Sequence, residues 1–222
     1  GPGRLRLRLE TMGGQLADDS SSCAPKAGRG APGRRARIRA EQRRLTLLNL
    51  ALLFGLGAVT TVLALRGGLA IPHGLPDPWT FLLESAAYVV AFDLYFYVLH
   101  RALHAPFAFR RVHVVHHRAR DVDPWSTIAM HPVEFLAIVG FVPLALWLAP
   151  VHAASVLAVC FFLGASIAFA HSGFEFRRTT DRVLLSAHFL VPRIHAAHHA
   201  YRRCNYGAIT TLFDRAAGTL RA

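Results

Sequence analysis

The sequence predicts an all-α integral membrane protein with about four transmembrane helices and a cytoplasmic cap of histidine-rich helices. Three observations support this fold class. Apolar residues gather in four long segments, arginines gather between the segments, and groups of histidines follow the segment ends. Of the 222 residues, 53% are hydrophobic and 17% are charged. Four such segments leave too little polar chain to cover them in water, which favours a membrane.

The first 44 residues are predicted to form a disordered basic arm. They are rich in Gly, Ala, Ser, Pro and Arg and nearly lack aromatic and β-branched residues, so they cannot build a core. Residues 45–222 are predicted to form one membrane-bound domain. The net charge of +12 would suit nucleic acid or a membrane surface. Because the arm runs directly into an apolar segment, we expect a membrane and no nucleic acid.

Four apolar segments are expected to enter the bilayer as helices. The first contains no charge and would span about 30 Å, the thickness of the hydrocarbon layer. The second is interrupted by Glu84 and Asp93. The last two are separated only near Pro150, which predicts a tight helical hairpin whose members need not cross fully. The segments comprise residues 45–65, 79–99, 133–149 and 151–170.

The distribution of arginines predicts the orientation. The basic arm should stay in the cytoplasm, and two crossings return the chain to that side near His100. The following loop, residues 100–132, is rich in arginine, as a cytoplasmic loop should be. The hairpin then places the arginine-rich part from His171 onward on the same side. We therefore expect a multi-pass protein whose N-terminus and histidine groups are cytoplasmic.

Eight histidines form three groups with helical spacing. Residues three or four apart share a helix face, so each group should direct its imidazoles at one point. One metal ion needs about three or four protein ligands, so eight imidazoles suit two ions. Imidazole binds Zn, Cu, Fe and Ni, and the residues alone do not name the metal. The groups are the HxxxH pair His100 and His104, and the HxxHH triplets His113, His116, His117 and His195, His198, His199.

The remaining histidines differ in their expected roles. His171 ends the fourth apolar segment on the same side as the groups and is predicted to be a further ligand. His131 is interpreted as a ligand, as a hydrogen-bond partner of a ligand, or as the residue that begins a helix. We interpret His73, His152 and His188 as surface or hydrogen-bonded residues.

Asp93 lies on the same helix face as the first histidine pair. Asp93, Tyr97, His100 and His104 are spaced at i, i+4, i+7 and i+11. A carboxylate in an apolar segment is costly unless it has a partner. We expect it to orient a ligand imidazole or a neighbouring arginine; the alternative is a simple buried ion pair, for example with Arg101. The other residues expected to hydrogen-bond around the ligands are Tyr97, His131, Glu134 and Asn205.

These motifs resemble the fatty acid hydroxylase/sterol desaturase superfamily over about residues 80–220. The resemblance extends beyond the histidines, and the order of the C-terminal motifs is similar to the sterol C5-desaturase branch. The matching stretches are residues 93–104, 131–134, 171–173, 195–199, 205–207, 210–215 and 218–219.

The resemblance implies a centre of two Fe ions, with O2 as co-substrate and an external electron donor such as a reductase, a cytochrome or a ferredoxin. Zn could replace Fe in a recombinant preparation. The positions that match the metal site of the family are His100, His104, His113, His116, His117, His171, His195, His198 and His199.

The predicted function is O2-dependent hydroxylation or desaturation of a lipid C–H bond in lipid biosynthesis. Sterol, carotenoid, fatty acyl and alkylglycerol substrates remain open. The chain has no Rossmann fingerprint, haem motif or Fe–S cysteine set, so electrons should come from a separate protein. One alternative is a membrane zinc-site protein or metal hydrolase without redox chemistry, against which the lack of HExxH counts. The other is a membrane protein that stores metal.

Overall fold

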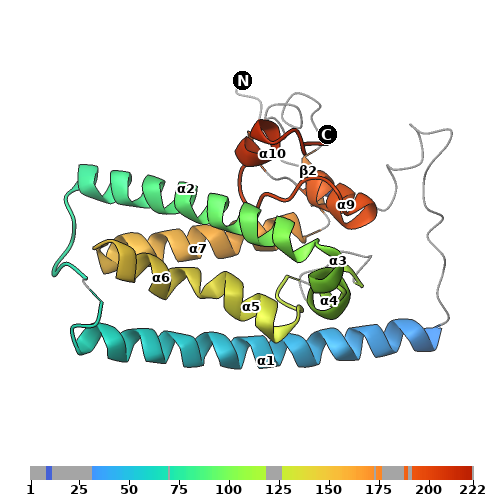
Figure 1. The fold of residues 1–222 in the computed structure, drawn as a ribbon, viewed down its shortest axis with the longest axis horizontal. Helices are drawn as coiled ribbons and strands as arrows, with labels where there is room; N and C mark the ends of the chain where they lie inside the picture. Colours follow the sequence, from blue (N-terminus) through green and yellow to red (C-terminus); the bar gives the residue numbers. More distant parts are fainter. Residues whose placement is uncertain are drawn as a thin grey trace, which may run out of the picture.

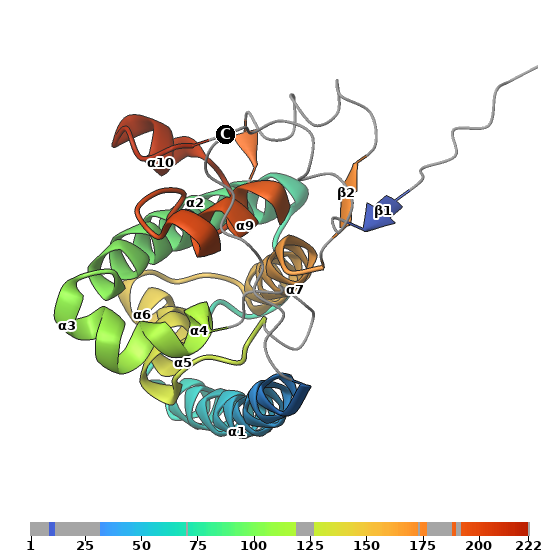
Figure 2. The same ribbon diagram turned by 90° about the vertical axis from the view of Figure 1, so that its right-hand side faces the viewer.

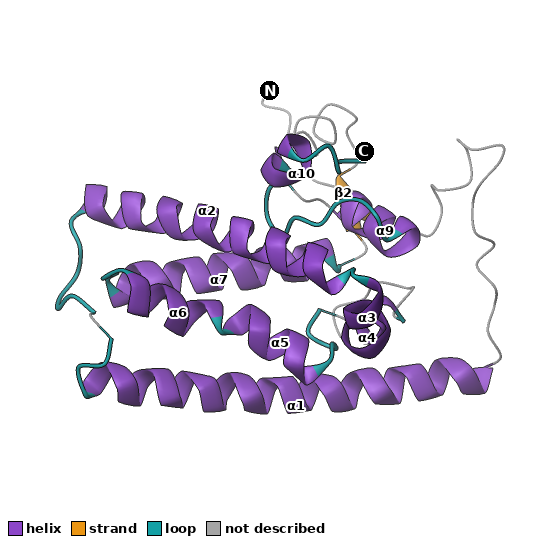
Figure 3. Cartoon of the chain, in the orientation of Figure 1, coloured by secondary structure: helices purple, strands orange, loops and turns teal. Residues whose placement is uncertain are grey.

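The computed structural model describes residues 9–11, 32–69, 71–118, 127–172, 174–176, 188–189 and 192–221. These parts of the chain are nearly all helical, as Figure 3 shows. Two three-residue strands, β1 (Leu9–Thr11) and β2 (Phe174–Phe176), pair antiparallel. The prediction of an all-α architecture is confirmed.

Three long helices form the part of the molecule that can cross a membrane. They are α1 (Pro32–Leu65), α2 (Pro78–Leu103) and α7 (Ala153–Ala170), and each is long and apolar enough to span a bilayer. Figure 1 shows their axes running roughly side by side. Large apolar side chains point outward from them; Phe54 is 75% exposed and Phe161 is 81% exposed. Such a surface suits lipid and not water.

The third apolar segment is divided into two short helices, α5 (Pro132–Val139) and α6 (Phe141–Leu148), that meet at Gly140. Pro143 has no N–H to donate to the carbonyl one turn earlier, so the helix is interrupted here. A Cβ at Gly140 would lie 2.7 Å from the Leu136 carbonyl oxygen. Among the described residues there are therefore three candidate spans and one shorter apolar segment, Pro132–Leu148, where four long segments were predicted.

The hairpin between α6 and α7 is fastened to α2 by Glu84. Its carboxylate accepts hydrogen bonds from the Nδ1 of His152 at 2.7 Å, from the backbone N–H of His152 at 3.2 Å, and from the Ser155 hydroxyl at 2.6 Å. The interpretation of His152 as a hydrogen-bonded residue is confirmed. Nearby, the Phe141 ring packs edge-on against Tyr88 and Phe92, with ring centroids 5.1 and 5.4 Å apart. These contacts hold α2, α6 and α7 together.

Helix α1 begins at Pro32, so residues 32–44 are helical and not disordered as predicted. Pro suits the first turn of a helix, and the Ala and Arg residues of this stretch favour helix. In this stretch Glu41 forms an ion pair with Arg118 at 3.1 Å, and both side chains are exposed. That residues 45–222 form one domain stays a prediction.

Short helices form a cap at one end of the long helices. Four of the cap elements are α-helical, and η1 is a turn of π-helix, a conformation that is often found at functional sites. The elements are α3 (Pro106–Ala108), η1 (Phe109–His113), α4 (Val114–His117), α9 (Pro192–Tyr201) and α10 (Leu212–Ala216). Figure 1 shows them near one end of α2 and α7, and Figure 2, turned by 90°, shows α9 and α10 beside α2.

Candidate metal centre

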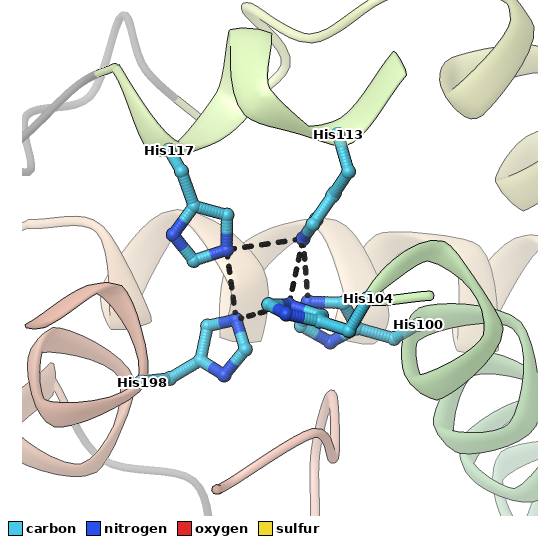
Figure 4. A group of neighbouring side chains, drawn as sticks. All are labelled: His100, His104, His113, His117 and His198. Atoms are coloured by element: carbon cyan, nitrogen blue, oxygen red, sulfur yellow. Dashed lines mark hydrogen bonds between the residues drawn. The ribbon is translucent and has the colours of Figure 1, made fainter. Parts of the chain in front are cut away.

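Nine imidazoles meet in two groups where α2 and α7 enter the cap. In each group the candidate ligand nitrogens all lie within 4.8 Å of one another. Figure 4 shows the first group, in which side chains from three separate stretches of the chain point at one position. The first group contains His100, His104, His113, His117 and His198; the second contains His116, His171, His195 and His199.

Each HxxHH motif serves both groups. His113 and His117 belong to the first group, and His116 between them belongs to the second. In the other motif the outer histidines join the second group, and His198 joins the first. The prediction that each motif aims at one point is therefore wrong. Residues four apart differ by about 40° around a helix, whereas adjacent residues differ by about 100°, so adjacent histidines must diverge.

The spacing of the nitrogens fits metal coordination. In the first group, neighbouring Nε2 atoms lie 3.0 to 3.2 Å apart. In the second, the Nε2 of His195 lies 3.0 Å from those of His171 and His199. Two nitrogens bound at about 2.1 Å from one ion would be about 3.0 Å apart at a right angle and about 3.4 Å apart in a tetrahedron. The separations are therefore compatible with nitrogens that share one ion in each group.

Four of the imidazoles are oriented through their other nitrogen. The Nδ1–H groups of His100, His113, His171 and His198 each donate a hydrogen bond, which leaves Nε2 free to bind a metal. The acceptors are, in the same order, the Tyr206 carbonyl at 2.9 Å, the Glu134 carboxylate at 2.7 Å, the Ile167 carbonyl at 2.9 Å and the Cys204 carbonyl at 2.7 Å. Glu134 therefore lies where the sequence predicted, against a candidate ligand.

Asp93 has different partners from those predicted. Its side chain is 1% exposed and accepts hydrogen bonds from the backbone N–H groups of Ala208, Ile209 and Thr210, at 3.2, 2.9 and 3.2 Å, and from the Thr210 hydroxyl. In the described structure it bonds to no imidazole and not to Arg101, so both predictions for it are wrong. The loop after α9 folds back onto α2 and buries N–H groups that need an acceptor.

A second buried carboxylate, Asp214, was missed by sequence reasoning. It accepts from the backbone N–H groups of Tyr206 and Gly207, both at 2.8 Å, and from the Thr219 hydroxyl at 2.7 Å. A Cβ at Gly207 would lie 2.5 Å from the Thr210 carbonyl oxygen, so only glycine fits. Asp93 and Asp214 thus hold the loop from both sides. The available signal was that Asp214 is the only acidic residue after Asp181.

Asn49 was also missed. It is fully buried on α1, and its side-chain amide donates to the carbonyls of Ile128 and Met130 at 2.6 and 3.0 Å. These bonds hold the start of α5, and so Glu134, against α1. An asparagine in an apolar helix was the signal that could have indicated it.

Other predicted residues support the cap without bonding to an imidazole in the described structure. The Tyr97 hydroxyl accepts from Arg101 at 3.1 Å and lies 3.2 Å from the Thr219 hydroxyl. The Asn205 side chain donates to the Ile194 carbonyl at 3.1 Å and to the Arg221 carbonyl at 2.8 Å, which ties the end of the described chain to α9.

The remaining histidines lie outside both groups. His131 begins α5, where its Nδ1 accepts from the Val133 N–H at 3.2 Å; this is the third of the roles considered for it. His73 and His188 are exposed.

Several of the cap imidazoles have a lowered pKa, which favours their neutral form. Burial, together with a smaller effect of neighbouring imidazoles, lowers the pKa of His104 to about 3 and that of His198 to about 4. A hydrogen bond to the Cys204 carbonyl offsets part of the effect at His198. Burial first, and other imidazoles second, also lower the pKa of His116, His117, His195 and His199. A neutral imidazole has the free nitrogen lone pair that metal binding requires.

These shifts predict that the metal-free protein loses stability in mild acid. Below about pH 6.5 the unfolded chain binds protons at these histidines, whereas the folded chain does not until about pH 4 for His198. The unfolded state binds more protons, so stability rises with pH and is lost as pH falls from about 6.5 toward 4. The slope is about 1.4 kcal/mol per pH unit for each such group.

Thermal unfolding of chelator-treated protein in detergent at pH 7.5 and 5.5 measures this effect. The melting temperature should be lower at pH 5.5, with the same pH difference in His188→Ala, because His188 is exposed. An equal or higher melting temperature at pH 5.5 would contradict the burial of neutral imidazoles.

Helices that can span a membrane, together with two converging sets of imidazoles, define a membrane protein with a histidine-rich metal centre as its candidate site. Residues 85–219 match the family described as fatty acid hydroxylase. The chain belongs to this family.

Similar proteins support the sterol desaturase branch. Three of them are the Delta(7)-sterol 5(6)-desaturases of Eremothecium gossypii, Saccharomyces cerevisiae and Gibberella zeae. They are 32%, 31% and 32% identical to this chain, over 63%, 63% and 65% of its length and 38%, 36% and 44% of their own. This chain thus spans about two-fifths of the length of these relatives. No solved structure matches it.

Proposed function

We propose that this protein is an O2-dependent di-iron oxidoreductase that hydroxylates or desaturates a C–H bond of a membrane lipid. The observation that carries the proposal is the convergence of nine imidazoles, five in one group and four in the other. Membership of the fatty acid hydroxylase family and similarity to sterol desaturases support lipid oxidation.

The five-histidine group would hold one iron and the four-histidine group the other. When bound, the iron pair supplies O2 activation and the removal of hydrogen from an unactivated carbon. The residues of the chain orient and shield this pair. Glu134 and three backbone carbonyls fix the imidazole rings, and the loop held by Asp93 and Asp214 closes the cap over them. The smaller group leaves more room for a further ligand.

Orientation and electron supply are also parts of this proposal. Exposed arginines cover the described cap, which supports a cytoplasmic location for the histidines and the N-terminus. The electrons would come from an external donor, a reductase, cytochrome or ferredoxin, that docks on the cap. The exposed arginines are Arg101, Arg110, Arg111, Arg118, Arg202, Arg203, Arg215 and Arg221.

A hydrolytic zinc enzyme is the competing function. It would need a carboxylate free to act as general base, whereas the carboxylate at the described histidines, Glu134, already accepts from His113.

Metal and oxygen dependence test the function. Protein purified from iron-supplied cells should contain about two irons per chain. Lipid extracts incubated with protein and a chemical reductant should gain a hydroxyl or a double bond in air and not under argon, with label from 18O2 entering any alcohol. His188→Ala should behave like the unmodified protein. Bound zinc with cleavage of a lipid by water under argon would establish the hydrolase instead.

A further inference from the structure

The two histidine groups differ in how the surrounding chain holds their imidazoles. In the five-histidine group three rings donate from Nδ1 to an acceptor, and one buried Nδ1, that of His117, lacks a partner among the described residues. In the four-histidine group the proportion is reversed. His171 donates to the Ile167 carbonyl at 2.9 Å, and each of the other rings has a buried Nδ1 that accepts from and donates to no described residue. These other rings are His116, His195 and His199.

A buried Nδ1 without an acceptor weakens an imidazole as a metal ligand. The Nε2 atoms of His195 and His199 lie 3.0 Å apart and face the group, so metal binding there leaves the ring proton on Nδ1. Burying that N–H with no acceptor is unfavourable, whereas an acceptor fixes the ring and raises its basicity. Loss of one such acceptor lowers metal affinity about 10- to 100-fold. We therefore expect weaker binding in the four-histidine group.

Negative charge also lies beside the five-histidine group. A divalent ion held by neutral imidazoles in a buried site is costly unless a negative group is near. Glu134 is 2% exposed, and its Oε1 lies 2.7 Å from the Nδ1 of His113, so one imidazole ring separates the carboxylate from the position at which the Nε2 atoms meet. The Oε2 of Glu134 has no partner in the described structure. No described donor other than His113 therefore offsets the charge of this carboxylate.

The other buried carboxylates support the same group. Asp214 accepts from the Tyr206 N–H at 2.8 Å, and the Tyr206 carbonyl accepts from His100 at 2.9 Å. Asp93 holds the continuation of this loop, residues 208–210. Within the described ranges, no buried carboxylate hydrogen-bonds to an imidazole of the four-histidine group. Ring orientation and charge thus favour the same group.

We propose that the two groups bind metal ions with unequal affinity. The five-histidine group fills first and retains its ion, the four-histidine group holds an ion that exchanges, and Glu134 is the positioning residue that contributes most to the difference. The inference deepens the proposed function and rests on it only in that the nine imidazoles bind two ions. It requires neither O2 nor a lipid. When metal is scarce, the chain would carry one ion, and filling of the four-histidine group would then limit activity.

Titration of the metal-free protein with cobalt(II) in detergent under argon tests the proposal. Calorimetry measures the affinities, and the visible absorption bands of the bound cobalt report its ligands. Two phases of about one ion each should appear, with dissociation constants at least about tenfold apart, within the range expected for loss of an acceptor. His199→Ala should keep the tight phase and lose the weak one. His198→Ala should lose the tight phase and keep the weak one.

Substitutions of Glu134 isolate its contribution. They are measured in the His199→Ala protein, where only the five-histidine group binds, and in the His198→Ala protein, where only the other group does. Glu134→Ala should weaken the five-histidine group about 10- to 100-fold and shift its cobalt bands. Glu134→Gln should weaken it less, because the amide oxygen can still accept from His113. Glu41→Gln, at an exposed acid, is the matched control and should change neither group.

The four-histidine group serves as an internal control for folding, because its ligands also lie in the cap. Its affinity should stay within about twofold in both Glu134 variants, since the hydrogen bond they remove belongs to the other group. The proposal is overturned if two ions bind with equal affinity, if His199→Ala removes the tight phase, or if both Glu134 variants act like Glu41→Gln. A chain that bound no metal would overturn the proposed function as well. Unequal binding without any lipid oxidation would refute the proposed function alone.

Discussion

Replacing both His198 and His199 by Ala is expected to remove both metal ions and abolish lipid oxidation, while the chain still inserts into the membrane. The two residues are adjacent but serve different groups. The Nε2 of His198 lies 3.2 and 3.1 Å from those of His104 and His117, and the Nε2 of His199 lies 3.0 Å from that of His195. The loss should exceed the roughly 10- to 100-fold effect of removing a residue that only orients a ligand.

The single substitutions make the test sharper. His198→Ala should leave the four-histidine group intact, and His199→Ala should leave the five-histidine group intact, so each should retain about one metal per chain by mass spectrometry. His188→Ala, outside both groups and exposed, is the control for the loss of a histidine. A double variant that kept two metals and full turnover would show that the nine imidazoles are not the metal site.

The site was largely predictable because helical spacing is local. HxxxH and HxxHH place imidazoles on neighbouring helix faces whatever the tertiary structure, and all nine predicted histidines do lie together. The division into five and four was not predictable. Helix geometry alone indicates that adjacent histidines such as His116 and His117 diverge. Which other imidazoles each of them meets depends on how η1, α4 and α9 are rotated against α2.

The residues around the imidazoles were harder to predict for the same reason. Glu134 was indicated by the resemblance of residues 131–134 to a motif of the family. The partners of Asp93 come from residues more than a hundred positions later, and those of Asn49 from a loop about eighty positions later. Both depend on burying backbone groups of a folded-back segment, for which the sequence carries no periodic signal.

Among the long helices, apolar length was a sufficient signal for α1, α2 and α7 but not for the third segment. Its composition was that of a membrane span, and the break at Gly140 depends on Pro143, which lies inside the apolar run. The region predicted to be disordered was too long. A composition poor in core-forming residues indicates that no hydrophobic core forms, but it does not exclude a helix. Residues 32–44 form the start of a long helix with little burial.

Replacing Asp93 by Asn is expected to destabilise the cap by about 2–4 kcal/mol, because an amide in place of the carboxylate would point N–H groups at donors that now have an acceptor. The carboxylate accepts from three backbone N–H groups and from the Thr210 hydroxyl. The released loop includes Tyr206, whose carbonyl orients His100. Metal affinity should therefore fall about 10- to 100-fold, less than in the double histidine variant.

Metal titration and thermal unfolding of Asp93→Asn measure the two effects. Asp77→Asn is the matched control on the same helix, because Asp77 is an exposed N-cap and asparagine caps helices about as well as aspartate. Weaker metal binding with a lowered melting temperature is expected only for Asp93. If Asp93→Asn bound metal as tightly as the unmodified protein, the loop after α9 would not be what keeps His100 in place. The hydrogen bond from His100 to the Tyr206 carbonyl would then form because the metal site is assembled, and would not be what assembles it.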